Sequence, residues 1–150
     1  MSSFYEVPIV SIRLVKDGGF FIQRDRIQSP GDVATLLLNR MCDLDREVMV
    51  VVHLDTRNQI LSIENAAVGA LGQTTIVIRE LFKGAILANA ATIIVAHNHP
   101  SGDPTPSPED IEVTKQIWEA GDLLGIELLD HIVIGHSRFI SLREQKLGFP

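Results

Sequence analysis

Two histidines separated by one residue, His97 and His99, stand just ahead of a loop and an acidic helix start. Side chains alternate along an extended segment, so these two imidazoles point to the same side and can meet one ion. The loop 100–106 contains prolines and Gly102, and it can turn the chain back toward them. Asp110 then supplies a carboxylate. The sequence therefore predicts a metal site of His97, His99 and Asp110, with the fourth tetrahedral position left to water as in catalytic zinc sites.

The residues around Asp110 also predict a helix that begins at Ser107. Pro108 suits the first helical position, and Asp110 falls in the first turn, where the helix dipole favours a carboxylate. Ser107, with an acidic residue three positions further on, is close to a capping box. A purely structural interpretation of Ser107, as a helix cap, therefore stands beside any catalytic one.

A zinc hydrolase needs, besides its ligands, a carboxylate that takes a proton from the attacking water and passes it to the leaving group. Three glutamates are candidates for this base. Glu47 opens a buried strand directly after the first predicted helix, and Glu64 ends an outer strand. Glu109 is next to a ligand and is expected to point away from the metal. The residues alone leave the choice among the three open.

The spacing HxHxxxxxxxSxxD resembles the JAMM (JAB1/MPN) metalloprotease motif. The longer string HNHPSGDPTPS, with NAAT before it and LLGIELLDHIVIG after it, resembles the bacterial RadC family within that superfamily. The similarity runs from about residue 29 to about residue 144. One departure is Ile78-Arg79-Glu80, where RadC members more often have Pro-Arg-Glu, and it affects the helix start at this place and not the metal site.

This resemblance implies an α/β fold, a mixed sheet flanked by helices in the cytidine-deaminase-like JAB/MPN arrangement. It selects Glu47 as the catalytic base and gives Ser107 the role of hydrogen-bond donor to the tetrahedral intermediate. It further implies one zinc ion per chain and a metallopeptidase or isopeptidase that acts on a protein or peptide. The physiological substrate is not supplied by the resemblance.

A nucleic-acid-associated binding module is the alternative, because the RadC family carries a historical DNA-repair label. Many members bear an N-terminal helix-hairpin-helix module, which we expect this chain to lack. The net charge of −6 opposes a broad nucleic-acid footprint, which needs clustered lysine and arginine. A third possibility, a single-metal nuclease, is less favoured, since many nucleases clamp phosphodiesters with two metals and ligands for one are present.

The length of 150 residues predicts one domain with a core of its own. No apolar run is long enough to cross a bilayer, and the start of the chain lacks a basic region followed by an apolar core, so we expect a cytoplasmic protein without a membrane partner. The single cysteine, Cys42, excludes an internal disulfide. The oligomeric state is left open.

Apolar periodicity and turn residues predict the elements that position the site. Residues 1–28 are expected to form a strand hairpin that belongs to the same domain as the RadC-like residues 29–150. The predicted strands span 7–15, 20–23, 47–54, 59–64, 92–96, 128–134 and 139–142, and the predicted helices span 30 to about 43–45, 79–89 and 108–124. Residues 65–75 are expected to be a loop.

The remaining polar residues are given mainly structural roles. Asn98 should face away from the metal and hold the neighbouring loop. His53 lies too far along its strand to be a ligand. For His131, in the DHIVIG string, a role in supporting the fold is favoured over a role in contacting and orienting a metal ligand. His136 is expected to be solvated in a turn, and Trp118 to belong to the core.

Overall fold

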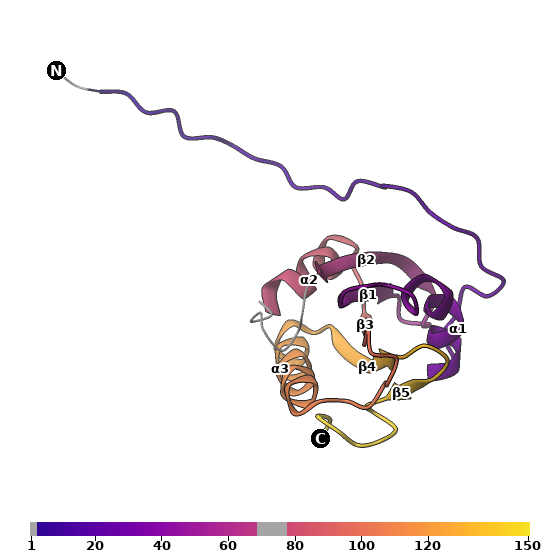
Figure 1. Cartoon of the computed structure of the whole chain (residues 1–150). Coiled ribbons are helices and arrows are strands. Elements are labelled where there is room, and N and C mark those ends of the chain that lie inside the picture. The colour runs from indigo at the N-terminus through magenta and orange to yellow at the C-terminus, as the bar shows by residue number, and fades with distance from the viewer. Residues whose placement is uncertain (1–2, 69–77) are drawn as a thin grey trace.

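The structure is a computed structural model, and it describes residues 3–68 and 78–150. Figure 1 shows a central sheet with helices on both sides and the N-terminal segment running away from this body. The elements in chain order are α1 (Pro30–Met41), β1 (Val48–Leu54), β2 (Ile60–Val68), α2 (Ile78–Leu87), β3 (Thr92–Asn98), α3 (Pro108–Leu124), β4 (Glu127–Ile134) and β5 (Phe139–Ser141).

The sheet has the strand order β2-β1-β3-β4-β5. β3 and β4 run parallel and the other neighbours run antiparallel. Helix α3 connects the two parallel strands, since a parallel pair needs a crossover connection. The mixed α/β fold expected from the resemblance is confirmed, and the carboxyl end of β3 lies beside the start of α3.

Two apolar cores lie on opposite faces of the sheet because side chains alternate along each buried strand. From β1, Val50 and Val52 face the core that contains α1, whereas Met49 and Val51 face the core under α2 and α3. The nearly continuous apolar run of β1 is therefore explained by burial on both faces. Figure 1 shows α1 on one side of the sheet and α2 with α3 on the other.

Capping residues explain where the helices begin and end. At the start of α1 the Asp32 carboxylate accepts hydrogen bonds from the backbone N–H groups of Gln28 and Ser29. At the end of α3, Gly125 adopts the left-handed conformation with φ of 72°, which a glycine adopts without strain. The predicted end of α3 is confirmed, whereas α1 stops at Met41, slightly before the predicted residues 43–45.

The predicted N-terminal hairpin is wrong. Residues 7–15 and 20–23 form no strands, and their apolar side chains are largely exposed. A two-stranded hairpin without a surface to cover is marginal in water. This segment meets the body at Phe20, whose ring centroid lies 4.3 Å from the guanidinium carbon of Arg40, and near Arg26, which forms one antiparallel bridge with Gln59. The grouping of residues 1–28 with the rest as one domain stays a prediction.

The region after β1 also differs from expectation. Strand β2 continues to Val68, so residues 65–68 are not a loop, because they pair with the start of β1. The rest of the predicted loop, residues 69–75, lies outside the described residues. Helix α2 starts at Ile78 and ends at Leu87, two residues before the predicted end. Within the described ranges, no helix has the length and apolar character that a bilayer crossing requires.

Candidate metal centre

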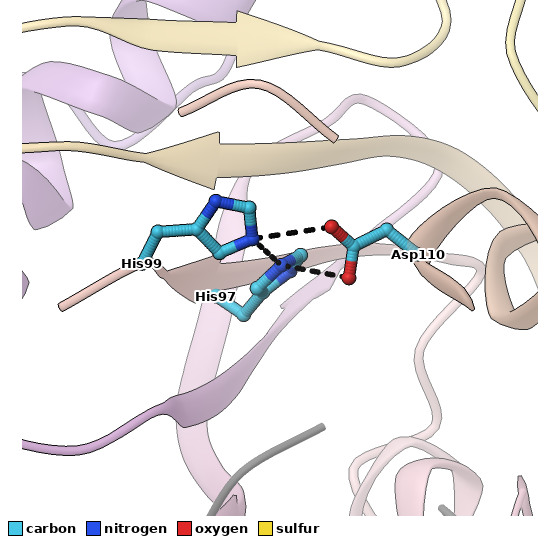
Figure 2. A group of neighbouring side chains, drawn as sticks. All are labelled: His97, His99 and Asp110. Carbon is cyan, nitrogen blue, oxygen red and sulfur yellow. Dashed lines mark hydrogen bonds and ion pairs between the residues drawn. The ribbon is translucent and has the colours of Figure 1, made fainter. Parts of the chain in front are cut away.

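Strand β3 and helix α3 bring the three predicted ligands together. His97 is the last residue but one of β3. His99 follows the strand, and its N–H donates to the carbonyl of Ile134 at 2.9 Å, which continues the pairing with β4. Asp110 lies in the first turn of α3. Figure 2 shows both imidazoles pointing at the two oxygens of the Asp110 carboxylate.

The spacing of the donor atoms fits a small divalent ion. The Nε2 atoms of His97 and His99 lie 3.1 Å apart. His97 Nε2 lies 3.2 Å from Oδ1 of Asp110, and His99 Nε2 lies 3.1 Å from Oδ2. Tetrahedral coordination with bonds of about 2.0–2.1 Å places neighbouring donors about 3.3 Å apart. Among the described residues, these three form the group that could hold a metal ion.

Burial and neighbouring charges shift the pKa values of Asp110 and His99 in the candidate metal site. Burial by itself raises the pKa of Asp110, but hydrogen bonds from His97 and His99 outweigh it and hold that pKa well below its usual range. The hydrogen bond to Asp110 raises the pKa of His99 against the opposing effect of burial. Since Asp110 and His97 are almost fully buried, their interactions are little screened by solvent.

The start of α3 fixes the Asp110 carboxylate. Oδ2 of Asp110 accepts a hydrogen bond from the backbone N–H of Ser107 at 2.8 Å, and Ser107 Oγ accepts one from the N–H of Asp110 at 3.1 Å. The predicted helix cap is thus present. A hydroxyl has one proton and two lone pairs, so Ser107 Oγ can accept this bond and still donate. The two interpretations of Ser107 are therefore compatible.

The loop between the ligands orients His99. Nδ1 of His99 lies 2.8 Å from the carbonyl oxygen of Asp103, which can only accept, so Nδ1 carries a proton. Nε2 is then the nitrogen that a metal would take, in place of its hydrogen bond to Asp110. Gly102 has φ of 89°, a conformation that favours glycine, and its carbonyl accepts from the N–H of His136 at 3.1 Å. His136 is exposed, as predicted, but its backbone also holds this loop.

His97 is held from behind by residues that the sequence interpretation did not assign to the site. Its Nδ1 lies 2.7 Å from Nε2 of His131, and Nδ1 of His131 lies 2.6 Å from Oγ1 of Thr114. Burial lowers the pKa of His131 well below its usual value, and a nearby charge on His97 acts in the same direction. Fold support was favoured for His131, whereas the structure places it against a candidate ligand. Thr114 lies within the predicted helix 108–124 and was given no role of its own.

Of the three candidate bases, Glu47 is the one whose charge acts on a candidate ligand. It is half-buried directly before β1, and its charge helps to raise the pKa of His99. Asn98 holds the backbone on both sides of it: Oδ1 accepts from the N–H of Val48 at 2.8 Å, and Nδ2 donates to the carbonyl of Arg46 at 3.0 Å. Asn98 was expected to hold the neighbouring loop, whereas its side-chain amide holds the segment around Glu47.

Glu64 and Glu109 have other surroundings. Oε2 of Glu64 lies 3.6 Å from Nε2 of His53, and burial raises the pKa of Glu64. His53 is buried and its Nδ1 lies 2.7 Å from Oγ of Ser62, in keeping with a structural histidine. Glu109 is exposed on the surface of α3.

Comparisons with known proteins show the family to which this chain belongs. A family model described as RadC-like JAB domain matches residues 27–147. A UPF0758 protein of Moorella thermoacetica is 55% identical over 128 residues, covering 85% of this chain and 56% of the relative. A UPF0758 protein of Chloroflexus aurantiacus is 51% identical over 127 residues, covering 85% of this chain and 56% of the relative. The chain spans just over half the length of these relatives, and with this family match it belongs to the RadC-like JAB domain family.

Proposed function

We propose that this chain is a zinc-dependent hydrolase of the JAMM type that cleaves an amide bond in a peptide or protein. The observation that carries the proposal is the convergence of two imidazole Nε2 atoms and one carboxylate within 3.1–3.2 Å of one another. A set of three nitrogen and oxygen donors with an open fourth position is typical of catalytic zinc sites. Membership in a JAB domain family supports a hydrolase of this kind.

When bound, zinc acidifies a coordinated water to a pKa of about 7 and polarises a carbonyl oxygen. His97, His99 and Asp110 would hold the ion, and the carboxylate would offset part of its charge. The Glu47 carboxylate would accept the proton of the attacking water and return it to the amide nitrogen as the carbon–nitrogen bond breaks. This transfer requires a carboxylate that is not a ligand, and Glu47 is the candidate whose charge acts on His99.

Ser107 would stabilise the charge that develops on the substrate carbonyl oxygen. Its Oγ accepts from the Asp110 N–H, so its own proton is available for a hydrogen bond to that oxygen. The cap holds the hydroxyl in one place before substrate arrives, which is what makes such a donor effective. Removing one donor of this kind lowers kcat by about 100- to 1,000-fold.

Metal content and turnover test the proposal. Protein purified without chelator should contain close to one equivalent of zinc, and His99→Ala should lose it. The activity probes are quenched fluorogenic peptides and an isopeptide linked through a lysine side chain. Glu47→Gln should reduce cleavage by about 100- to 10,000-fold while zinc is retained. Glu64→Gln and Glu109→Gln serve as matched controls and should remain active.

The proposal is abandoned if the chelator-free protein contains no stoichiometric zinc. The assignment of Glu47 as the base is contradicted if Glu47→Gln cleaves the probes as fast as wild type, because the proton transfer then does not pass through this carboxylate. A loss of activity in Glu64→Gln with activity kept in Glu47→Gln would assign the base to Glu64.

A further inference from the structure

A chain of three hydrogen bonds connects one candidate ligand to the backbone of another. It runs from His97 Nδ1 to His131 Nε2 at 2.7 Å, and from His131 Nδ1 to Thr114 Oγ1 at 2.6 Å. It ends with a hydrogen bond from Thr114 Oγ1 to the carbonyl oxygen of Asp110 at 2.6 Å. His97, His131 and Thr114 are all fully buried, so solvent cannot replace any of these partners.

The last acceptor determines the direction of two of the three bonds, and metal binding at His97 determines the third. The Asp110 carbonyl can only accept, so the single hydroxyl proton of Thr114 is directed to it. Thr114 Oγ1 must then accept from His131 Nδ1–H. With His131 neutral, its Nε2 carries a lone pair and accepts from His97 Nδ1–H. A metal on Nε2 of His97 requires the proton on Nδ1, and the lone pair of His131 Nε2 is the acceptor 2.7 Å from it.

The opposite polarity is excluded by short contacts between like groups. If Thr114 donated to His131, two oxygen lone pairs would face each other at the 2.6 Å separation of Thr114 Oγ1 and Asp110 O. If His131 also carried a proton on Nε2, that proton would oppose, at 2.7 Å, the Nδ1–H that His97 must keep when a metal occupies its Nε2. Either arrangement leaves a buried polar group unsatisfied, which costs about 1–3 kcal/mol.

We propose that His131 and Thr114 are positioning residues that set the tautomer and the ring orientation of His97, so that its Nε2 faces the metal. The inference rests on the proposed metal site and does not require peptidase activity. His99 is oriented separately, by the Asp103 carbonyl in the exposed loop. The two histidine ligands therefore have independent supports, one inside the core and one at the surface.

The position of Thr114 on α3 explains why this support is possible. Thr114 lies four residues after Asp110, on the same helix face, and reaches His131 on β4. β4 is hydrogen-bonded to β3, which carries His97. The relay therefore closes a ring through β3, β4 and α3, and the orientation of one ligand is tied to the helix turn that carries another.

The first test is the tautomer of His131 in the wild-type protein. Long-range proton–nitrogen NMR spectra of the imidazole rings distinguish a proton on Nδ1 from one on Nε2. The proposal expects His131 to carry its proton on Nδ1, with and without zinc. A proton on Nε2 in the wild type would overturn the proposal, whatever the activity of the protein.

The second test is zinc affinity, measured by competition with a fluorescent zinc chelator. Thr114→Val keeps the shape of the side chain but removes the hydroxyl, and it should weaken zinc binding about 10- to 100-fold. Thr114→Ser restores the hydroxyl and should bind nearly as tightly as wild type. The matched control is Thr92→Val, because Thr92 Oγ1, at the other end of β3, has no hydrogen-bond partner among the described residues.

The outcomes separate the relay from the proposed function. Unchanged zinc affinity in Thr114→Val, with native circular dichroism, contradicts the relay. If Thr114→Val does not fold, the wild-type tautomer of His131 decides the question alone. If the wild type itself fails to bind zinc, the proposed function is lost, while the tautomer measurement still tests the hydrogen-bond direction.

Discussion

The two hydrogen bonds of Asn98 support a specific prediction about Glu47. Asn98 is 1% exposed and bonds the backbone on both sides of Glu47, at Arg46 O and Val48 N. Asn98→Ala removes both partners. A buried donor or acceptor left unsatisfied costs about 1–3 kcal/mol. Val48 is half-buried, whereas Arg46 is exposed and its carbonyl can be hydrated, so we expect a loss of about 2–4 kcal/mol in the free energy of unfolding.

Urea denaturation measures this loss, and zinc affinity shows where it acts. Asn98 is not part of the donor group, so Asn98→Ala should bind zinc almost as well as wild type. Cleavage should nevertheless fall, because Glu47 is no longer held in place. Asn39→Ala is the control, since Asn39 is exposed on α1 and alanine is the better helix former. An unfolding free energy for Asn98→Ala equal to that of wild type, with full cleavage, would refute the reasoning.

Three further predictions concern the loop, the buried histidine and the metal. Gly135→Ala would place a Cβ against the carbonyl oxygen of Gly102, so it should displace the ligand loop and weaken zinc binding about tenfold, measured by chelator competition. Burial lowers the pKa of His53 in the folded protein, so below the usual histidine pKa of about 6.5 the unfolded chain binds more protons than the folded one, and the free energy of unfolding should fall as the pH drops. Urea titrations of metal-free protein should show a smaller fall in His53→Gln than in wild type, and equal falls would contradict this. Removing zinc should lower Tm, since a ligand at 1,000 times its Kd stabilises by about 4 kcal/mol, and an unchanged melting curve would count against a folded-state site.

The grouping of the three candidate ligands was predictable from the sequence because its geometry is mostly local. Strand alternation places His97 and His99 on one side, and the helix signals at Ser107 and Pro108 locate Asp110. The apolar run of β1 likewise predicted a strand buried on both faces. These inferences use neighbours within a few residues, where periodicity and capping chemistry are reliable guides.

The support behind the ligands was not predictable, because it depends on packing between distant elements. His131 meets His97 only because β4 pairs with β3, and Thr114 meets His131 only because α3 packs on that strand. A polar threonine one turn after Asp110 on an inward face was the available signal. The N-terminal hairpin was predicted wrongly because its local pattern favoured strands, whereas residues 7–15 and 20–23 do not pair with the sheet. The cytoplasmic location and the choice of partner stay predictions.

The hydrogen bonds that hold Asp110, His97 and His99 in place affect how quickly the site can bind a metal ion. Its carboxylate is already aimed by the Ser107 N–H, and both imidazoles already have their rear nitrogens engaged. Binding of a metal ion then requires little reordering of the ligand side chains, because their conformational entropy was already lost when the chain folded. Association kinetics should accordingly be a single fast phase without a slow isomerisation step.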